Sequence, residues 1–466
     1  MLFSSTFFLI YFFPIFFTIY FTIPIGLKNY FIVLASLLFY AWGAPKFVFI
    51  LLGTIIFNFI LAHLIAKTSD KKQKLLLFSV LGNLGLLLFF KYANFFIENV
   101  NMLFASIGIH SLNVMRIALP IGISFFTFHQ LSFIIDVYRG VKPPMKKISD
   151  YALYILLFPQ LIAGPIIRYN EIADQIQGRN KRFNLDGVLV GFLRFSVGLA
   201  KKVLLANVLG KEADRIFALP TEQLDFMLSW IGAITYTFQI YFDFSGYSDM
   251  AIGIAKMMGF TFPENFNNPY IAQSITDFWR RWHISLSRWM RDYLYIPLGG
   301  NKVSGARLYF NLWVVFLISG LWHGAEWTFI LWGAYHGFFL AIERLFLLKI
   351  TSKIGTFLRV LFTFFTVVFG WVLFRAENVK QALLFFKKMF SFEFKEYLFS
   401  SHLLWILIVA TLISFIPLFY KNKKMEEVNL SNARVVFNTL VILVFMVLCI
   451  SEITSSDFNP FIYFKF

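Results

Sequence analysis

Long apolar stretches recur along this chain, and short polar connections separate them. The first 27 residues carry no charged side chain, and Lys28 is the first charged residue. A cleavable signal peptide begins with a basic segment, which this start lacks, so we interpret the first stretch as a retained span. Further apolar runs lie at about 29–42, 47–66, 75–90, 117–135, 357–374, 402–420 and 434–450. Stretches of this length and character predict membrane-spanning α-helices.

The composition supports a membrane protein and excludes other classes. Of the 466 residues, 59% are hydrophobic and 14% are charged, whereas a soluble domain has roughly 45–50% apolar and about 25% charged residues. At about 20 residues per spanning helix, the apolar residues set a ceiling of roughly fourteen spans. Cys449 is the only cysteine, so a disulfide-bonded secreted scaffold is excluded.

The basic residues predict how the chain is oriented. Its formal net charge is +17, and the lysines and arginines gather in short connections, as the positive-inside rule requires of cytoplasmic loops. The segment Lys67–Lys74 holds four lysines and one aspartate, and a later apolar run is followed by Arg139, Lys142, Lys146 and Lys147. Placing both clusters in the cytoplasm puts the N-terminus outside. A docking surface for an acidic carrier is the alternative role of this charge, and we expect no nucleic-acid partner.

The middle of the chain differs from both ends. We divide a single integral-membrane domain, residues 1–466, into N-terminal spans (1–150), a central region that carries the site (151–345) and C-terminal spans (346–466). In the centre, glycine and proline interrupt shorter apolar stretches, as in Phe158–Pro165 and Gly320–Gly324. Interrupted backbone at membrane depth is tolerated only inside protein or beside a water-filled cavity. We therefore expect the functional site in this region.

Ionisable side chains are rare in the apolar runs, and burying one is costly, so each is informative. His323 lies inside the apolar segment Trp313–Trp327, where a neutral imidazole can accept a proton near neutral pH. Gly320 and Gly324 beside it would let a substrate or another backbone come close. A hydrogen-bonded core histidine is the alternative. His336 follows thirteen residues later and could share the same cavity.

His283 is the second candidate, and it lies in a segment that is both basic and aromatic, Phe278–Asp292. If this segment is one helix, one side carries Arg281, Ser285 and Arg288, and the other carries Trp282 and Trp289. Such a helix suits an anionic headgroup or cofactor. A helix lying at the membrane interface is the alternative.

Other polar residues have simpler explanations. Asp243 and Asp249 lie beside an apolar run and could orient a histidine, but pairing with arginines is the simpler role. His63 and His402 lie near the ends of apolar runs, and His110 lies in a predicted external loop. Interfacial placement accounts for them without a function.

Metal binding and nucleotide chemistry find little support. His323 and Glu326 have a spacing that can chelate a metal, yet no second histidine lies one turn away and no cysteine helps, so we expect no metal site. The sequence also lacks the phosphate-binding loop, the dinucleotide fingerprint, the zinc-protease motif and the serine nucleophile motif.

Several motifs resemble one known family. Gly320-Leu-Trp-His-Gly324, preceded by Phe278-Trp-Arg-Arg-Trp-His283, resembles the membrane-bound O-acyltransferase (MBOAT) family. The resemblance is closest to its alginate O-acetyltransferase branch, which includes peptidoglycan O-acetylation transporters. It runs nearly end to end through seven further segments: Phe39–Trp42, Leu119–Ser124, Phe158–Pro165, Tyr241–Asp249, Pro263–Tyr270, Gly370–Arg375 and Asn459–Phe466.

The resemblance implies a ring-like, all-α polytopic fold of about 11–13 membrane-embedded helices, some broken or re-entrant, around a central funnel and tunnel. It also implies that His323 and His283 are catalytic. His323 would be the general base, and His283 or a neighbouring donor would stabilise the oxyanion or position the thioester. The substrate or donor contacts that we expect are Arg280, Arg281, Trp282, Ser285, Trp322 and Asp243.

The implied function is O-acylation across a membrane. An acetyl or other acyl group would pass from a cytosolic thioester, acetyl-CoA or another, across the inner membrane to an extracytoplasmic polysaccharide such as alginate or peptidoglycan. The implied partner is a periplasmic acetyltransferase of the SGNH type or similar, and no cofactor is bound permanently. D-alanyl transfer to teichoic acid is one alternative, since those enzymes share the Trp-His-Gly core. A secondary transporter or flippase is another, because broken helices and buried ionisable groups also mark transport sites.

Overall fold

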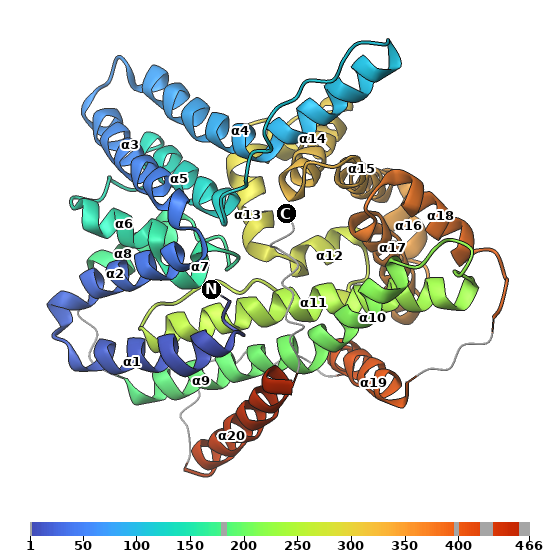
Figure 1. Cartoon of the computed structure of the whole chain (residues 1–466). Helices are drawn as coiled ribbons and strands as arrows, with labels where there is room; N and C mark the ends of the chain where they lie inside the picture. Colours follow the sequence, from blue (N-terminus) through green and yellow to red (C-terminus); the bar gives the residue numbers. More distant parts are fainter. Residues whose placement is uncertain (1, 179–183, 396–399, 420–431, 456–466) are drawn as a thin grey trace. The chain divides into compact units, whose positions relative to one another are not determined.

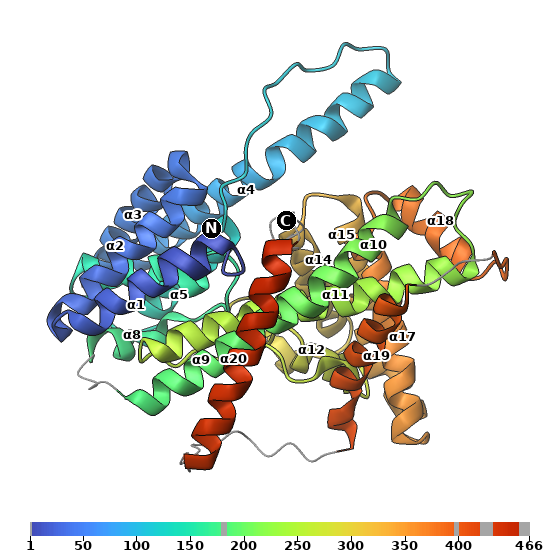
Figure 2. The ribbon, with the colours of Figure 1, turned by 60° about the horizontal axis from the view of Figure 1, so that its bottom comes forward.

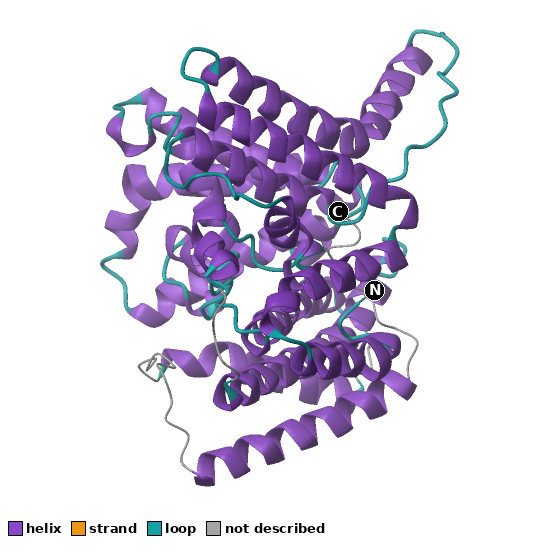
Figure 3. Cartoon of the chain, turned by 90° about the vertical axis from the view of Figure 1, so that its left-hand side faces the viewer, coloured by secondary structure: helices purple, strands orange, loops and turns teal. Residues whose placement is uncertain are grey.

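The computed structural model describes residues 2–178, 184–395, 400–419 and 432–455. These residues form helices and loops, and no strand occurs among them, as Figure 3 shows. The predicted all-α class is therefore confirmed. The basic stretch 421–424 and the motif Asn459–Phe466 lie outside the described residues. By its contacts the chain falls into two compact units: Met1–Leu185 with Gly259–Phe262 (unit 1), and Asp186–Met258 with Pro263–Phe466 (unit 2).

Unit 1 contains the first apolar runs, drawn in blue and teal in Figure 1. Its helical elements are η1 (Phe8–Phe12), α1 (Phe13–Thr22), α2 (Ile25–Gly43), η2 (Pro45–Phe47), α3 (Val48–Lys67), α4 (Lys72–Ser106), α5 (Ile123–Tyr138), α6 (Ile148–Leu156), α7 (Phe158–Leu161) and α8 (Tyr169–Gln177). The predicted runs 29–42, 47–66, 75–90 and 117–135 each lie wholly or largely within one of these helices. The first stretch, interpreted as one span, instead divides among η1, α1 and the start of α2.

Unit 2 begins with a long helix pair and ends with the C-terminal helices. Its first elements are α9 (Leu185–Ala200), η3 (Lys201–Ala206), α10 (Asn207–Phe217), α11 (Phe226–Met257), η4 (Pro269–Ile271), α12 (Ile275–Arg281), α13 (Ile284–Met290), η5 (Arg291–Tyr295) and η6 (Gly300–Lys302). The remaining elements are α14 (Ala306–His323), α15 (Trp327–Ile342), η7 (Glu343–Leu347), α16 (Leu348–Thr351), α17 (Thr356–Arg375), α18 (Val379–Met389), α19 (Ser401–Phe415), η8 (Ile416–Leu418) and α20 (Asn432–Ser455). Helix α10 packs along α11, as Figure 2 shows.

Seven helical segments of the described chain are long and apolar enough to cross a membrane. They are Ile25–Gly43, Pro45–Lys67, Lys72–Ser106, Trp327–Thr351, Thr356–Arg375, Ser401–Leu418 and Val435–Ser455. A shorter apolar helix, Phe8–Thr22, precedes them. The prediction of a polytopic membrane protein is thus confirmed. The ring-like arrangement and the larger number of embedded helices stay predictions.

Buried polar side chains join the helices of unit 1. Asn58 of α3 donates to the Oδ1 of Asn83 in α4 over 3.0 Å, and Gln130 of α5 donates to Thr54 of α3 over 2.8 Å. Such bonds hold helices together where lipid offers no hydrophobic drive between them. The Lys72 ammonium lies 4.9 Å from the centroid of the Tyr138 ring. The connection between α3 and α4 therefore lies beside the C-terminal end of α5.

Helix α4 is longer than the sequence predicted. The apolar run ends near residue 90, but the helix continues to Ser106. Asn94 in this extension exchanges two hydrogen bonds with the backbone of Ile117, at 2.8 and 3.0 Å. Asn101 does the same with Leu112. These contacts with the following loop give the polar extension a partner that the hydrophobic pattern does not encode.

Glycines let two helix pairs of unit 2 approach closely. A Cβ on Gly191 of α9 would lie 2.7 Å from the carbonyl oxygen of Gly253 in α11, and one on Gly198 would lie 2.5 Å from that of Gly246. In the α14–α15 hairpin, a Cβ on Gly320 would lie 3.2 Å from the Cα of Gly333. Small residues at crossings are typical of membrane helices. The hairpin crossing brings α15 against the end of α14, where His323 lies.

Candidate active site

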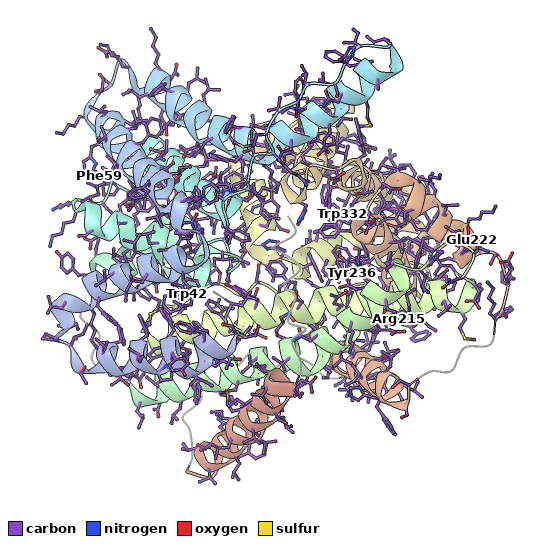
Figure 4. The ribbon with its side chains drawn as sticks, viewed as in Figure 1. Trp42, Phe59, Arg215, Glu222, Tyr236 and Trp332 are labelled. Atoms are coloured by element: carbon purple, nitrogen blue, oxygen red, sulfur yellow. The ribbon has the colours of Figure 1, made fainter. Side chains whose placement is uncertain are left out.

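His323 is the last residue of α14 and lies in an aromatic enclosure within unit 2. Its side chain is 4% exposed. The rings of Trp322, Trp332 and Phe374 lie 4.7, 5.0 and 5.1 Å from its ring, centroid to centroid, and all three meet it edge to face. Trp332, labelled in Figure 4, is fully buried. His323, which the sequence places in an apolar segment, is thus surrounded by aromatic rings.

His283 lies at a sharp break between α12 and α13, with φ 43° and ψ 54°. This left-handed conformation is rare for a residue with a side chain and costs roughly 1–3 kcal/mol. The prediction that Phe278–Asp292 forms one helix is therefore wrong. The break is held by a facing loop, because Ile284 N–H donates to the Asn265 carbonyl and Asn267 N–H donates to the Arg281 carbonyl, each at 2.9 Å.

The break gives His283 a defined polar contact. Its Nδ1 lies 3.1 Å from the Oδ1 of Asn265, which also accepts from the Ser285 hydroxyl at 2.8 Å. The ring is 1% exposed and lies outside the seven candidate spans. Burial lowers the pKa of His283 to about 3, so the ring is neutral at physiological pH.

The two histidines share a neighbour. Trp322 lies 4.7 Å from His323 and 6.1 Å from His283, measured between ring centroids. Phe244 of α11 covers another part of the His283 ring, with centroids 4.7 Å apart and planes nearly perpendicular. The structure therefore brings the two predicted catalytic residues into one buried aromatic cluster around Trp322.

His336 joins the same cluster, as the sequence suggested. It is fully buried on α15 and packs edge to face on Trp279 and Trp332, at 5.0 and 5.1 Å. Trp332 thus contacts both His336 and His323. A Cβ on Gly370 of α17 would lie 2.7 Å from the Nε2 of His336, so this glycine makes room for the ring. Neither nitrogen of the His336 ring has a hydrogen-bond partner among the described residues.

Five other residues that the sequence predicted to contact the substrate or donor lie in different surroundings. Arg280 is exposed and forms no hydrogen bond or ion pair with the described residues, whereas Arg281 pairs with Asp277 at 2.9 Å. Trp282 is buried and lies 5.6 Å from Phe278 and 4.8 Å from Trp371, centroid to centroid. Ser285 lies against His283, and Trp322 lies against both His283 and His323.

Asp243 lies on α11 in a buried ion pair. It forms an ion pair with Lys202 of η3 at 2.7 Å, and both side chains are almost fully buried. Asp249, one and a half turns later on α11, pairs with Arg194 and Lys201 at 2.7 and 2.6 Å. The structural pairing that the sequence favoured for both aspartates is confirmed, although one partner is an arginine and two are lysines.

Sequence reasoning missed two buried polar residues near the site. Asn265 lies in a segment quoted only for its family resemblance, yet it binds His283. Glu343, in the π-helical turn η7, accepts hydrogen bonds from the backbone N–H groups of Ile275 and Thr276 at 2.5 and 2.9 Å. It also accepts from the Thr276 hydroxyl at 2.8 Å. Glu343 therefore caps the start of α12, the helix that leads into His283.

Three of the remaining histidines belong to unit 1 and one belongs to unit 2. In unit 1, the Nδ1 of His63 lies 2.9 Å from the carbonyl of Phe59 in its own helix, and His110 lies in an exposed loop. His129, which the sequence left without a role, is fully buried and accepts from the backbone N–H of Ile167 at 3.3 Å. His402 is exposed near the start of α19. Among the described residues, no three His, Cys, Asp or Glu side chains lie close enough to hold a metal ion.

Comparisons with known proteins match the part of the chain that carries this site. A model of the membrane-bound O-acyltransferase family matches residues 123–386, which include both His283 and His323. A probable alginate O-acetylase of Pseudomonas putida is 40% identical, over the full length of both chains. One of Pseudomonas aeruginosa is 46% identical, over 84% of this chain and 75% of its own. The peptidoglycan O-acetyltransferase of Helicobacter pylori is 39% identical, over 84% of this chain and 80% of its own.

Proposed function

We infer the function from one premise: the chain belongs to the membrane-bound O-acyltransferase family and is a multi-pass membrane O-acyltransferase. We propose that it moves an acetyl group from acetyl-CoA or another cytosolic thioester across the inner membrane. The acetyl group then modifies an extracytoplasmic polysaccharide of the alginate or peptidoglycan type. The single observation that carries the proposal is the buried cluster of His283, Trp322 and His323 inside the region that matches the family.

In the proposed reaction, His323 is the general base. It takes the proton of an acceptor hydroxyl while the hydroxyl oxygen attacks the carbonyl carbon of the thioester, a role worth about 10²–10⁴-fold in rate. The tetrahedral intermediate collapses, the C–S bond breaks, and sulfur leaves with the bonding electrons. The His323 imidazolium then returns the proton to sulfur. The products are an acetyl ester and a free thiol, and His323 is neutral again.

A buried site explains how acetylation outside can use a donor from inside. The donor remains on the cytosolic side, and only the acetyl group passes the cluster. Arg280, exposed and close in sequence to His283, is suited to the phosphates of such a donor. We propose that a periplasmic transferase of the SGNH type supplies the hydroxyl, carries the acetyl group to the polymer and selects the sugar.

The orientation of the chain is part of the proposal. The positive-inside rule places the connection between α3 and α4, and the segment after α5, in the cytoplasm, with the N-terminus outside. The contact between Lys72 and Tyr138 supports this, because it sets the two basic clusters at one end of unit 1. If the two basic clusters lay at opposite ends of unit 1, the positive-inside rule would not predict a single orientation.

Replacing the base tests the proposal in cells. His323→Ala should lower polysaccharide O-acetylation at least about 100-fold, while the amount of protein in the membrane stays unchanged. The matched control is His402→Ala, because His402 is exposed near the start of α19 and should leave acetylation as in the wild type. The measurement is the acetyl ester content of the isolated polymer, normalised to the protein in the membrane. Normal acetylation with His323→Ala would contradict the assignment of the base.

A further inference from the structure

The side chain of Asn265 makes several polar contacts around His283. Its side chain is 1% exposed. The Oδ1 lies 3.1 Å from His283 Nδ1 and 2.8 Å from the Ser285 hydroxyl, and the Nδ2 donates to the Ser248 hydroxyl at 3.0 Å. Both ends of the amide are thus engaged, one by α11 and the other by the break between α12 and α13.

The backbone of Ser285 settles which end of the amide faces His283. Its N–H, which can only donate, points at the Oδ1 of Asn265 over 3.3 Å. If the amide were turned around, its NH₂ group would face this N–H, and two donors would oppose each other. The atom beside His283 is therefore the oxygen, which can only accept. His283 must donate to it, so its Nδ1 carries the proton.

A neutral imidazole that donates from Nδ1 has its lone pair on Nε2. We propose that Asn265 is a positioning residue that holds His283 in this tautomer, and that the Nε2 of His283 accepts a hydrogen bond from an amide N–H of the thioester donor. The proposal rests on the proposed function and deepens it, because it names the part of the donor that His283 recognises.

The chemistry of the reactants indicates that an amide N–H of the donor is the group that donates to the Nε2 of His283. The acceptor hydroxyl has one proton, and His323 takes it. The acetyl thioester itself carries no hydrogen-bond donor, whereas the pantetheine arm of acetyl-CoA has amide N–H groups close to the sulfur. A neutral His283 in this tautomer cannot donate to the oxyanion. Of the two roles that the sequence left open for His283, positioning of the thioester therefore remains.

The surroundings of His283 keep the ring in place. The left-handed backbone at His283 and the two backbone bonds across the break fix where the side chain begins. Phe244 and Trp322 pack on the ring, and Asn265 and Ser285 face its Nδ1 edge. Trp322, which packs on His283, also contacts the titratable side chain of His323.

The tautomer can be measured directly, without any activity. In full-length protein labelled with ¹⁵N-histidine and held in lipid vesicles, solid-state NMR distinguishes a protonated ring nitrogen from a bare one. The His283 signals are identified by their loss in His283→Gln. We expect a neutral ring with the proton on Nδ1. A proton on Nε2 would overturn the proposal, whether or not the preparation is active.

Two model donors test the hydrogen bond itself. S-acetyl-N-acetylcysteamine keeps an amide N–H near the sulfur, and S-ethyl thioacetate has none. Asn265→Leu should raise the KM of the first about 3- to 10-fold, the effect of one neutral hydrogen bond, and leave the KM of the second unchanged. Equal losses with both donors would show a merely structural role for Asn265 and overturn the proposal.

A charge at the same position adds a pH signature. Asn265→Asp keeps the acceptor for Nδ1, so it should restore the KM for the amide donor above neutral pH. Its carboxylate also raises the pKa of His283, and protonation removes the Nε2 lone pair. The rise in KM on acidification should therefore begin at higher pH than in the wild type.

Asn267 offers the matched control, because it lies in the same loop with an exposed side chain. Asn267→Asp and Asn267→Leu should both behave as the wild type. The experiments distinguish a failure of the proposed function from a failure of the proposed recognition of the donor by His283. A wild-type protein that consumes no acetyl thioester contradicts the proposed function, whereas an active protein with indifferent Asn265 variants contradicts only the recognition by His283.

Discussion

Replacing Glu343 by alanine should loosen the start of α12 and displace His283 at its far end. The Glu343 carboxylate accepts three hydrogen bonds, at 2.5, 2.9 and 2.8 Å, from two residues of the first turn of α12. The helix has only seven residues, Ile275–Arg281. A short helix depends on its caps, because few internal hydrogen bonds hold it.

The size of the effect follows from these contacts. A hydrogen bond to a charged group contributes about 1.5–3 kcal/mol. Thr276 is partly exposed, so water can replace part of what is lost there, but Ile275 is fully buried. We therefore expect Glu343→Ala to lower the free energy of unfolding by about 3 kcal/mol. Glu343→Gln should cost roughly half of that, because one oxygen still accepts and the new NH₂ group faces a backbone N–H.

Thermal unfolding in mild detergent and acetyl transfer by the same samples provide the assay. The alanine variant should unfold roughly 3 °C lower and lose about 10²-fold in kcat, since a shift of 1 Å at a reacting group can cost that much. Glutamine should lie between alanine and the wild type. Glu377→Ala is the control, because Glu377 is exposed outside the site. Wild-type stability and kcat in Glu343→Ala would refute the reasoning.

Two further predictions concern the packing of unit 2. Gly370→Ala should push the His336 ring against Trp332 and lower kcat at least about tenfold, because the new Cβ would lie 2.7 Å from the ring. An unchanged kcat would contradict this prediction, because it would show that the ring can move away from the new Cβ. Lys202→Met and Asp243→Asn should each destabilise the protein by about 3–5 kcal/mol, because each removes one charge of a buried ion pair. The double variant Lys202→Met/Asp243→Leu should recover most of that loss in a thermal unfolding measurement, and a purely additive loss would contradict the pairing.

Six of the seven candidate spanning segments were predictable because each is a single apolar run, whereas Trp327–Thr351, in the central region, was not among the predicted runs. Helices α2, α3 and α17 begin and end within a few residues of the predicted runs. The end of α4 was not predictable, since its last turns are polar and are held by Asn94 and Asn101 binding a distant loop. A hydrophobic pattern reports which face meets lipid or core. It does not report which polar side chains find backbone partners after folding.

The candidate residues of the site stand out in the sequence because ionisable side chains are rare there. His323 stands out as a histidine inside an apolar run, and His283 as a histidine in a basic and aromatic segment. The break at His283 was not predictable, because the residues around it are ordinary in a helix and the loop that holds it comes from Asn265 and its neighbours. The partners of the site are also remote in sequence. Asn265 lies 18 residues from His283, and Glu343 lies 68 from Ile275.

The central claim is that acetyl passes through the protein while the donor stays behind. Inverted membrane vesicles, with the cytosolic face outward and periplasmic contents sealed inside, test it most directly when acetyl-labelled acetyl-CoA is added to the outside. The account predicts labelled acetyl ester in the lumen, free thiol outside, and neither in vesicles carrying His323→Ala. Luminal ester that forms equally well with His323→Ala, or wild-type vesicles in which no label crosses, would contradict it.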